Sequence, residues 1–280
     1  MTGTVDTTRE LAAFLRSRRE RLDPRDLGLP PRRQHRRTPG LRREEVAELA
    51  GVSTDYVVRL EQGRGLRPSP EVLEALARAL RLDEVERDYL FDLARQRRPD
   101  DGKSATTAAP ELALLVADLS PLPAMVVNHR YDILAWNREM SLLLLDFDAL
   151  PPRQRNTMWL CVLHPDLREF FGDRERAMRE GIAGLRAAWA AHPDDAVLVE
   201  RIEEFRSGSA EFEHWWTQRD VRVNGRGHKV FHHPELGVLT VRYEQLMPLQ
   251  DPDQCLVIYR AADEESRTAL HRLTAGPTAE

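Results

Sequence analysis

Hydrophobic residues between positions 43 and 62 recur at the spacing of two short helices joined at a glycine. Val46, Leu49, Val52, Val57 and Leu60 are spaced so that they face inward and hold the two helices together. An ordinary helical hairpin is the alternative, because apolar residues at helical spacing usually form a core and nothing more.

Three residues at special positions favour a helix-turn-helix over that alternative. Ala47 is small where the two helices would cross, so their backbones can approach closely. Gly51 falls where the first helix must stop, and glycine adopts a left-handed backbone there at little cost. Ser53 can cap the second helix by accepting a free backbone N–H. The pattern therefore predicts a helix-turn-helix whose second helix enters the major groove of DNA.

The outer face of that second helix and the residues beside it are the predicted contacts to DNA. We expect them to be Arg42, Arg43, Ser53, Thr54, Asp55, Val58, Arg59, Gln62 and Arg64. Arg59 has two interpretations: it contacts DNA, or it pairs with Glu44 or Glu45 and holds the two helices together.

A basic insert precedes the helix-turn-helix. Residues 23–40 contain four prolines, so this segment is not helical throughout. No acidic residue occurs between positions 32 and 43, where His35 lies beside Arg32, Arg33, Arg36, Arg37, Arg42 and Arg43. Such a run beside a DNA-reading helix favours contact with backbone phosphates or the minor groove. A solvated loop that only keeps the protein soluble is the alternative.

The pattern changes from helical to mixed after a linker-like stretch. Residues 98–110 have no apolar face, which separates a domain at 1–97 from one at 111–265 and a C-terminal tail at 266–280. A hairpin is expected at 124–128 and 131–136, followed by helices at 173–191, 195–205 and 209–218. Strands are expected at 228–233, 238–247 and 256–261. This order predicts an α+β chain: an all-α helix-turn-helix bundle, then a PAS-like domain in which helices cover an antiparallel sheet and enclose a cavity.

Composition agrees with two domains of different charge. The 280 residues carry a formal net charge of −5, which taken alone argues against nucleic acid. The first 100 residues, however, hold 21 basic and 18 acidic residues, so the negative charge belongs to the remainder. Only Lys103 and Lys229 are lysines among the 41 basic residues.

The sequence favours neither an enzyme nor a membrane protein. Cys161 and Cys255 form no metal-binding or redox spacing, and adjacent His232 and His233 would point to opposite faces of a strand. Glycine-rich phosphate loops and nucleophile elbows are absent from the sequence. The polar start and the short apolar runs lead us to expect a cytoplasmic protein with reduced cysteines, no metal and no membrane contact.

Two family resemblances follow from these motifs. Arg59-Leu60-Glu61-Gln62-Gly63-Arg64, Pro68-Ser69-Pro70 and the helix-like run from Leu73 to Leu80 resemble the phage-repressor-like (XRE) helix-turn-helix family over about residues 8–95. Residues 110–262 resemble the ligand-binding domain of the MmyB-like transcription regulators. The matching stretches are Ala135-Trp136-Asn137, Arg168-Glu169-Phe170-Phe171, His192-Pro193-Asp194-Asp195, Trp216-Thr217-Gln218-Arg219-Asp220-Val221, His233-Pro234-Glu235-Leu236-Gly237, Leu239-Thr240-Val241-Arg242-Tyr243-Glu244 and the segment from Asp253 to Tyr259. Tyr56-Val57-Val58 and Arg219 depart from the family's usual residues, which puts the operator and the ligand in question.

The second resemblance implies a pocket for an apolar, fatty-acid-like ligand, with no other cofactor. Aromatic and methionine side chains of this half would supply an apolar wall, and a few polar groups would hold a carboxylate. The residues expected there are Trp136, Asn137, Met140, Arg155, Trp159, Phe170, Trp216, Arg222 and His232. In the alternative interpretation, the aromatic side chains are ordinary core residues and the arginines form ion pairs at the surface.

The resemblances together imply a transcription regulator that binds a promoter operator as a homodimer and senses a small apolar molecule. The main alternative is a DNA-binding regulator whose C-terminal domain serves only dimerisation or the binding of a protein partner. An enzyme that carries a DNA-binding module is the third.

Overall fold

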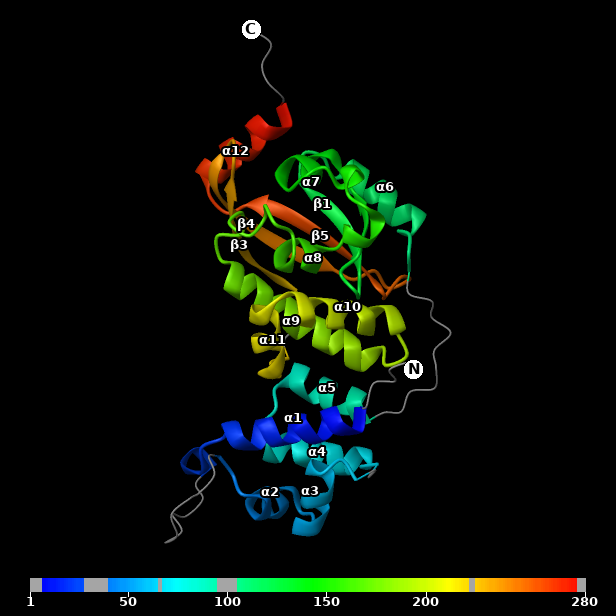
Figure 1. Ribbon diagram of the computed structural model, residues 1–280, viewed down its shortest axis with the longest axis vertical. Helices are drawn as coiled ribbons and strands as arrows, with labels where there is room; N and C mark the ends of the chain where they lie inside the picture. Colours follow the sequence, from blue (N-terminus) through cyan, green and yellow to red (C-terminus); the bar gives the residue numbers. More distant parts are fainter. Residues whose placement is uncertain (1–6, 28–39, 65–66, 95–104, 222–224, 276–280) are drawn as a thin grey trace. The chain divides into compact units, whose positions relative to one another are not determined.

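The computed structural model of the chain describes residues 7–27, 40–64, 67–94, 105–221 and 225–275 (Figure 1). It contains two compact units, Met1–Asp100 with Trp189–Val199, and Asp101–Ala188 with Glu200–Glu280. The described part of residues 1–100 is helical, whereas the second unit contains a five-stranded sheet. The α+β class predicted from the sequence is therefore confirmed.

The N-terminal bundle is built from amphipathic helices that surround one apolar core. Its elements are α1 (Thr7–Arg21), the short 3₁₀ helix η1 (Pro24–Leu27), α2 (Arg43–Ala50), α3 (Thr54–Glu61), α4 (Pro70–Ala79) and α5 (Glu84–Ala94). Phe14 of α1 is fully buried and meets the ring of Tyr89 of α5 edge-on, with ring centroids 5.0 Å apart. Leu41, Val57, Leu60 and Leu76 are also buried, so every part of the bundle contributes to this core.

The C-terminal unit is organised around an antiparallel sheet. Its strands are β1 (Ala124–Asn128), β2 (Ile133–Trp136), β3 (Arg226–His233), β4 (Gly237–Leu246) and β5 (Gln254–Ala261), in the spatial order β2-β1-β5-β4-β3. The hairpin and the three late strands predicted from the sequence are all present within two residues of their expected bounds. Because β5 pairs with both β1 and β4, the early hairpin and the late strands form one sheet.

Alternate strand residues separate the two faces of this sheet. Val126 and Leu256 point to one face, where they pack with Leu112 and Val116 of α6 (Pro110–Asp118). The other face carries the larger core. The sheet residues in this core are Met125, Phe231, Leu239, Val241, Tyr243, Val257 and Tyr259. The candidate binding site lies on this second face.

Helices between β2 and β3 extend over the second face of the sheet. They are α7 (Arg138–Leu143), α8 (Thr157–Val162), α9 (Arg174–Ala191), α10 (Ala196–Gly208) and α11 (Ala210–Thr217), with 3₁₀ turns η2 (Phe147–Ala149) and η3 (Pro152–Gln154). The three longer helices predicted from the sequence correspond to α9, α10 and α11. Among the described residues, no helix combines the length and apolar character needed to cross a bilayer.

The C-terminal segment differs from the tail expected at 266–280. Residues Glu264–Ala275 form helix α12, and its Leu270 is buried in the large core. Asp263 begins this helix by accepting a hydrogen bond from the Ser266 backbone N–H at 2.8 Å. Most of the expected tail is therefore an integral layer of the C-terminal unit.

Candidate functional site

The predicted helix-turn-helix is present with its expected turn. Gly51 ends α2 with a left-handed backbone (φ 67°, ψ 31°), a conformation that favours glycine. The Ser53 hydroxyl caps α3 by accepting the Tyr56 backbone N–H at 3.1 Å. Ala47, Val57 and Leu60 are buried between the helices, so the short turn holds α3 firmly against α2.

One apolar position of this motif was wrongly predicted. Leu49 was expected to face inward, but 40% of its surface is exposed. Val46, Ala47 and Ala50 are buried, and Leu49 lies roughly a third of a turn away from the centre of that buried arc. The inward face of α2 is therefore narrower than the sequence pattern suggested.

The outer face of α3 is open to solvent. Of the residues predicted to contact DNA, Ser53, Thr54, Asp55, Arg59, Gln62 and Arg64 are exposed, and Val58 is half-buried. Arg59 lies on this outer side with its side chain exposed. This exposure favours the interpretation in which the Arg59 guanidinium contacts DNA, and that contact stays a prediction.

Arg42 and Arg43, by contrast, have partners within the bundle. Arg42 precedes α2; its backbone N–H donates to Glu45 at 2.7 Å, and its guanidinium to Glu44 at 3.4 Å. The Arg43 Nε donates to a carboxylate oxygen of Glu61 at 2.7 Å. Glu61 is buried and also pairs with the buried Arg19 at 2.6 Å, so Arg43 helps to neutralise a buried charge that joins α1 to α3. The other four arginines of the basic run, at 32, 33, 36 and 37, lie outside the described residues.

The C-terminal unit contains a partly open cavity of about 100 Å³ between the sheet and α8–α9. Its wall is formed by Met125, Tyr131, Leu144, Thr157, Met158, Leu160, Cys161, Phe171, Ala177, Glu180, Gly181, Gly184, Lys229, Tyr243, Gln245 and Tyr259. All of these residues belong to the second unit. A mostly apolar wall with a few polar groups is typical of a binding site for a small molecule.

Helix α9 presents three small residues and Glu180 to this cavity. Ala177, Glu180, Gly181 and Gly184 follow the i, i+3, i+4, i+7 spacing of one helical face. A methyl group on Gly181 would overlap the sulfur of Met158, and one on Gly184 would overlap the hydroxyl of Tyr131. The two glycines therefore make the space that these longer side chains occupy against the helix.

Tyr131 reaches the cavity from the turn between β1 and β2. Its backbone is left-handed (φ 69°), which is uncommon for a residue with a bulky side chain. The Asn128 side chain stabilises the turn by accepting the backbone N–H groups of Arg130 and Asp132, each at 2.9 Å. Burial raises the pKa of Tyr131 to about 12, so its hydroxyl is neutral at physiological pH.

Lys229 supplies the positive charge of the wall. Its Nζ lies 5.5 Å from the ring centre of Tyr243 and 5.9 Å from that of Tyr259. Strand pairing explains the cluster, because Tyr243 is opposite Tyr259 and Lys229 is two residues beyond the partner of Tyr243 on the same face. Burial alone would lower the pKa of Lys229, but its interactions with Tyr259, Cys161 and Tyr243 raise it above the ordinary value. The side chain is therefore an ammonium ion at neutral pH.

Several residues predicted to bind the ligand are part of the framework around the cavity. Asn137 is buried: its side-chain oxygen accepts the backbone N–H groups of Ala124 and Met140, both at 3.0 Å, and its amide donates to Leu122 at 2.8 Å. Met140 is fully buried core. Trp136 packs on Phe147 and lies under the guanidinium of Arg155, whose Nε donates to the Leu150 carbonyl. None of these side chains is in the cavity wall.

The remaining predicted ligand contacts also lie outside the cavity wall. Trp159 meets His164 edge-on, and Phe170 is buried against Phe231 with ring centres 5.0 Å apart. Trp216 stacks on Phe212, and His232 is exposed, with its ring near the Glu169 carbonyl. Arg222 lies outside the described residues.

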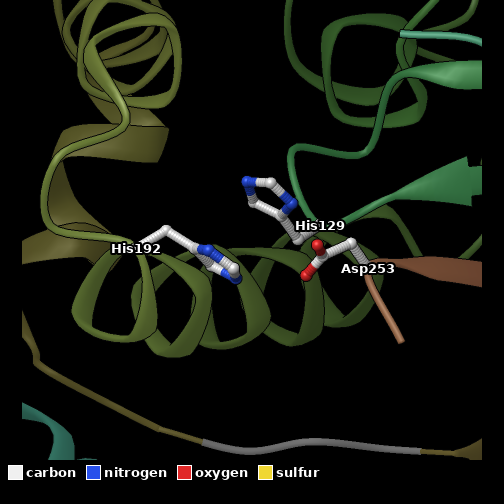
Figure 2. Close-up of side chains that lie close together, drawn as sticks. All are labelled: His129, His192 and Asp253. Carbon is white, nitrogen blue, oxygen red and sulfur yellow. The ribbon is translucent and has the colours of Figure 1, made fainter. Parts of the chain in front are cut away.

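Three polar side chains outside the cavity wall are of types that can bind a metal ion. His129 follows β1, Asp253 precedes β5 and His192 follows α9 (Figure 2). His192 belongs to the first unit, whereas His129 and Asp253 belong to the second, so we assign the three to no common site.

Cys161 and Cys255 are free thiols, and burial raises the pKa of Cys255 to about 11.

Sequence reasoning missed Lys229, Tyr243 and Tyr259 as site residues. One signal was present: Lys229 is one of only two lysines among the 41 basic residues of an arginine-rich chain. Lysine differs from arginine in carrying a compact cation on a flexible stem, so this position differs chemically from the other basic positions of the strands.

Comparisons with known proteins agree with this two-part organisation. A model of a helix-turn-helix domain matches residues 10–90, and a model of the MmyB-like transcription regulator ligand binding domain matches residues 108–273. An uncharacterized HTH-type transcriptional regulator of Methanothermobacter thermautotrophicus is 38% identical over 60 residues, which are 21% of this chain and 86% of that protein. The chain therefore belongs to the MmyB-like transcription regulators, and joins a helix-turn-helix domain to the ligand-binding domain of that family.

Proposed function

We propose that this regulator binds a promoter operator through α3 and adjusts that binding to an apolar, fatty-acid-like ligand held in its C-terminal domain. The partly open cavity carries this proposal, because it lies within the matched ligand-binding domain and its wall is mostly apolar. The sheet order β2-β1-β5-β4-β3, with helices inserted between β2 and β3, supports a PAS-like sensor fold.

The DNA side of the proposal rests on the exposed face of α3. Thr54, Asp55, Arg59 and Gln62 offer hydrogen-bonding groups along that face, and base edges in the major groove are read by such groups. Helix-turn-helix proteins commonly bind as dimers to half-sites about 34 Å apart. A homodimer would give each operator two such recognition helices.

The ligand would act by favouring one arrangement of the protein over another. A ligand shifts an equilibrium only when its affinities for the two states differ. By reciprocity, the ligand then changes operator affinity by the factor by which the operator changes ligand affinity. The proposal thus requires that DNA and ligand binding be thermodynamically coupled.

The first test is to identify what the protein carries. The full-length protein would be purified and denatured, and its organic extract examined by mass spectrometry. About one equivalent of an apolar acid per chain is the expected result. An empty extract, together with no binding of straight-chain acids or alcohols to the purified protein, would favour a C-terminal domain that serves only dimerisation or a protein partner.

A further inference from the structure

The face of the sheet on which α6 packs is exposed over β3 and β4. Helix α6 lies on β1 and β2 (Figure 1). On β4, Val238, Arg242 and Leu246 point to this face and are exposed, whereas Leu239 and Tyr243 between them are buried on the other face. We call this exposed part of the face the open half. Its exposed residues are Arg226, His228, His232, Val238, Arg242, Leu246 and Arg260.

Positive charge predominates on the open half. The strands place three arginines and one glutamate on it. Glu244 pairs with Arg260 at 3.1 Å and lies 3.8 Å from Arg226. Arg242 is directly opposite Arg260 in the pairing of β4 with β5, and like charges at such positions destabilise a sheet. The open half therefore favours an acidic partner.

The outer face of α6 has the complementary composition. Glu111, Leu114, Leu115 and Asp118 follow the i, i+3, i+4, i+7 spacing of one helical face, and all four are exposed. Leu114 has 68% of its surface exposed and Leu115 has 43%. This face is therefore apolar in its middle and acidic at both ends, and burial of its two leucines would favour association.

The dimensions of the two surfaces agree. Neighbouring strands lie about 4.8 Å apart, so β5, β4 and β3 span about 10 Å, which is the diameter of a helix. The nine residues of α6 extend about 13 Å along its axis. Leu246 and Arg242 are four residues apart on β4, which is also about 13 Å. One α6 helix therefore fits on the open half with its leucines near Leu246 and a carboxylate near Arg242.

The distribution of charge selects a second copy of this chain as the partner. Two open halves placed together would bring arginines against arginines, and two outer faces of α6 would bring carboxylates against carboxylates. An α6 helix on the open half of another copy instead places carboxylates beside arginines. Because one unit carries both surfaces, the contact is repeated in the opposite direction, which is the self-complementary pattern of a two-fold dimer.

We infer that two copies of this protein associate through their C-terminal units, with the outer face of α6 in each copy packed on the open half of the other copy's sheet. This inference rests on the homodimer of the proposed function and names the surfaces through which it forms. The dimer would bury Leu114, Leu115 and Leu246 and would neutralise the Arg242–Arg260 pair.

Charge reversal, followed by sedimentation velocity of the full-length protein over a range of concentrations, tests this interface. The helix variant combines Glu111→Arg with Asp118→Arg, and the sheet variant combines Arg242→Glu with Arg260→Glu. Each variant places like charges across both contacts of the dimer. Each should therefore raise the Kd of dimerisation at least about tenfold.

A mixture of the two variants gives the more specific result. In a mixed dimer, the new arginines on α6 of the helix variant face the new glutamates on the open half of the sheet variant. The second contact joins the two surfaces that neither variant has changed. An equimolar mixture should therefore form dimers at a concentration at which each variant alone is monomeric.

Arg153→Glu is the matched control for charge reversal. Arg153 resembles Arg260 in being exposed and paired with glutamate, with side-chain exposures of 60% and 53%. It lies in η3, among the elements between β2 and β3 that extend over the opposite face of the sheet. The control variant should dimerise as the wild type does, and melting temperatures would verify that all variants are folded.

The outcomes separate the interface from the rest of the proposed function. Reversal variants that dimerise as the wild type does would overturn the interface, and so would a mixture that stays monomeric. If a reversal variant melts at a markedly lower temperature, Leu114→Arg and Leu246→Glu repeat the test with the same expected pattern. A wild type that is monomeric at every concentration would overturn both the interface and the homodimer. It would leave the sensing of an apolar ligand standing, because the organic extract tests that separately.

Discussion

Tyr131 shows how a single residue joins the fold to the cavity. It combines a left-handed backbone with a hydroxyl that lies against Gly184, and the side chain of Asn128 holds the turn in place. A left-handed conformation costs free energy in a residue other than glycine, so the surrounding contacts must stabilise it. Such residues gather at binding sites, which agrees with the position of Tyr131 in the cavity wall.

The buried hydroxyl of Tyr131 predicts a loss of stability in alkali. Burial raises its pKa from 10 to about 12, so the folded protein holds a proton that the unfolded chain releases above pH 10. The stabilisation is complete below the unfolded pKa and is lost as pH rises through the folded pKa. Between about pH 8 and pH 10.5 this group alone should lower the free energy of unfolding by about 1 kcal/mol. Tyr131→Phe should reduce the alkaline loss by that amount.

Urea unfolding followed by tryptophan fluorescence measures this effect, because all five tryptophans lie after residue 135. The free energy of unfolding of Tyr131→Phe near neutral pH is the control, because it includes any change in packing caused by removing the hydroxyl. An alkaline loss identical in wild type and Tyr131→Phe would show that the hydroxyl is not buried as described.

The role of a residue could be predicted from the sequence when that role depends on its neighbours along the chain. Gly51 and Ser53 were predicted correctly because a helix end and a helix start are defined by neighbours in sequence. Lys229 was missed because its neighbours Tyr243 and Tyr259 come from β4 and β5, and Tyr259 is 30 residues away in sequence. Strand pairing alone brings them to the same face of the sheet. Asn137 was predicted as a ligand contact, yet its side chain binds backbone groups on two segments, residues 122–124 and the start of α7.

At the scale of elements, α3 is an exposed helix with a fixed base. The Ser53 cap and the buried Val57 and Leu60 fix its position, and the Arg19–Glu61–Arg43 cluster anchors its last turn to α1 and α2. Because the buried side of α3 carries the stability of the motif, changes on its outer side should affect DNA binding alone.

Arg59→Ala tests that separation. The substitution should weaken operator binding about tenfold or more, the range for a lost base or phosphate contact, and leave the melting temperature unchanged. Arg78→Ala is the control, because Arg78 is an exposed arginine on the bundle helix α4. Operator affinity would be measured by fluorescence anisotropy and melting by calorimetry. A fall in melting temperature that accompanies the loss of binding would mean that Arg59 supports the fold instead.

Helices and strands could be predicted from the sequence where their apolar residues repeat at a regular spacing. The strands and α9–α11 were predicted because their apolar residues repeat clearly over many positions. Helix α12 was expected to be a tail, since few of its residues are apolar and Leu270 is buried only after the sheet has formed. The acidic cap Asp263 before Glu264 was the local signal that could have indicated a helix there.

At the scale of the whole molecule, charge and chemistry are divided between two units. The first 100 residues are net basic and include an exposed recognition helix, while the acidic remainder contains a partly open, mostly apolar cavity. A ligand in the second unit can influence DNA only if its binding free energy differs between DNA-competent and DNA-incompetent states. Regulation by a ligand therefore requires a measurable coupling between ligand binding and DNA binding.

That coupling is most directly measured as operator affinity at zero and saturating ligand. Operator fragments would be selected from genomic DNA with the full-length protein, and their Kd measured with and without octanoate, hexanoate and palmitate, with saturation verified by calorimetry. The proposed coupling predicts that a bound acid changes the operator Kd by about fivefold or more, the usual lower range of allosteric coupling. An unchanged Kd at verified saturation would contradict it.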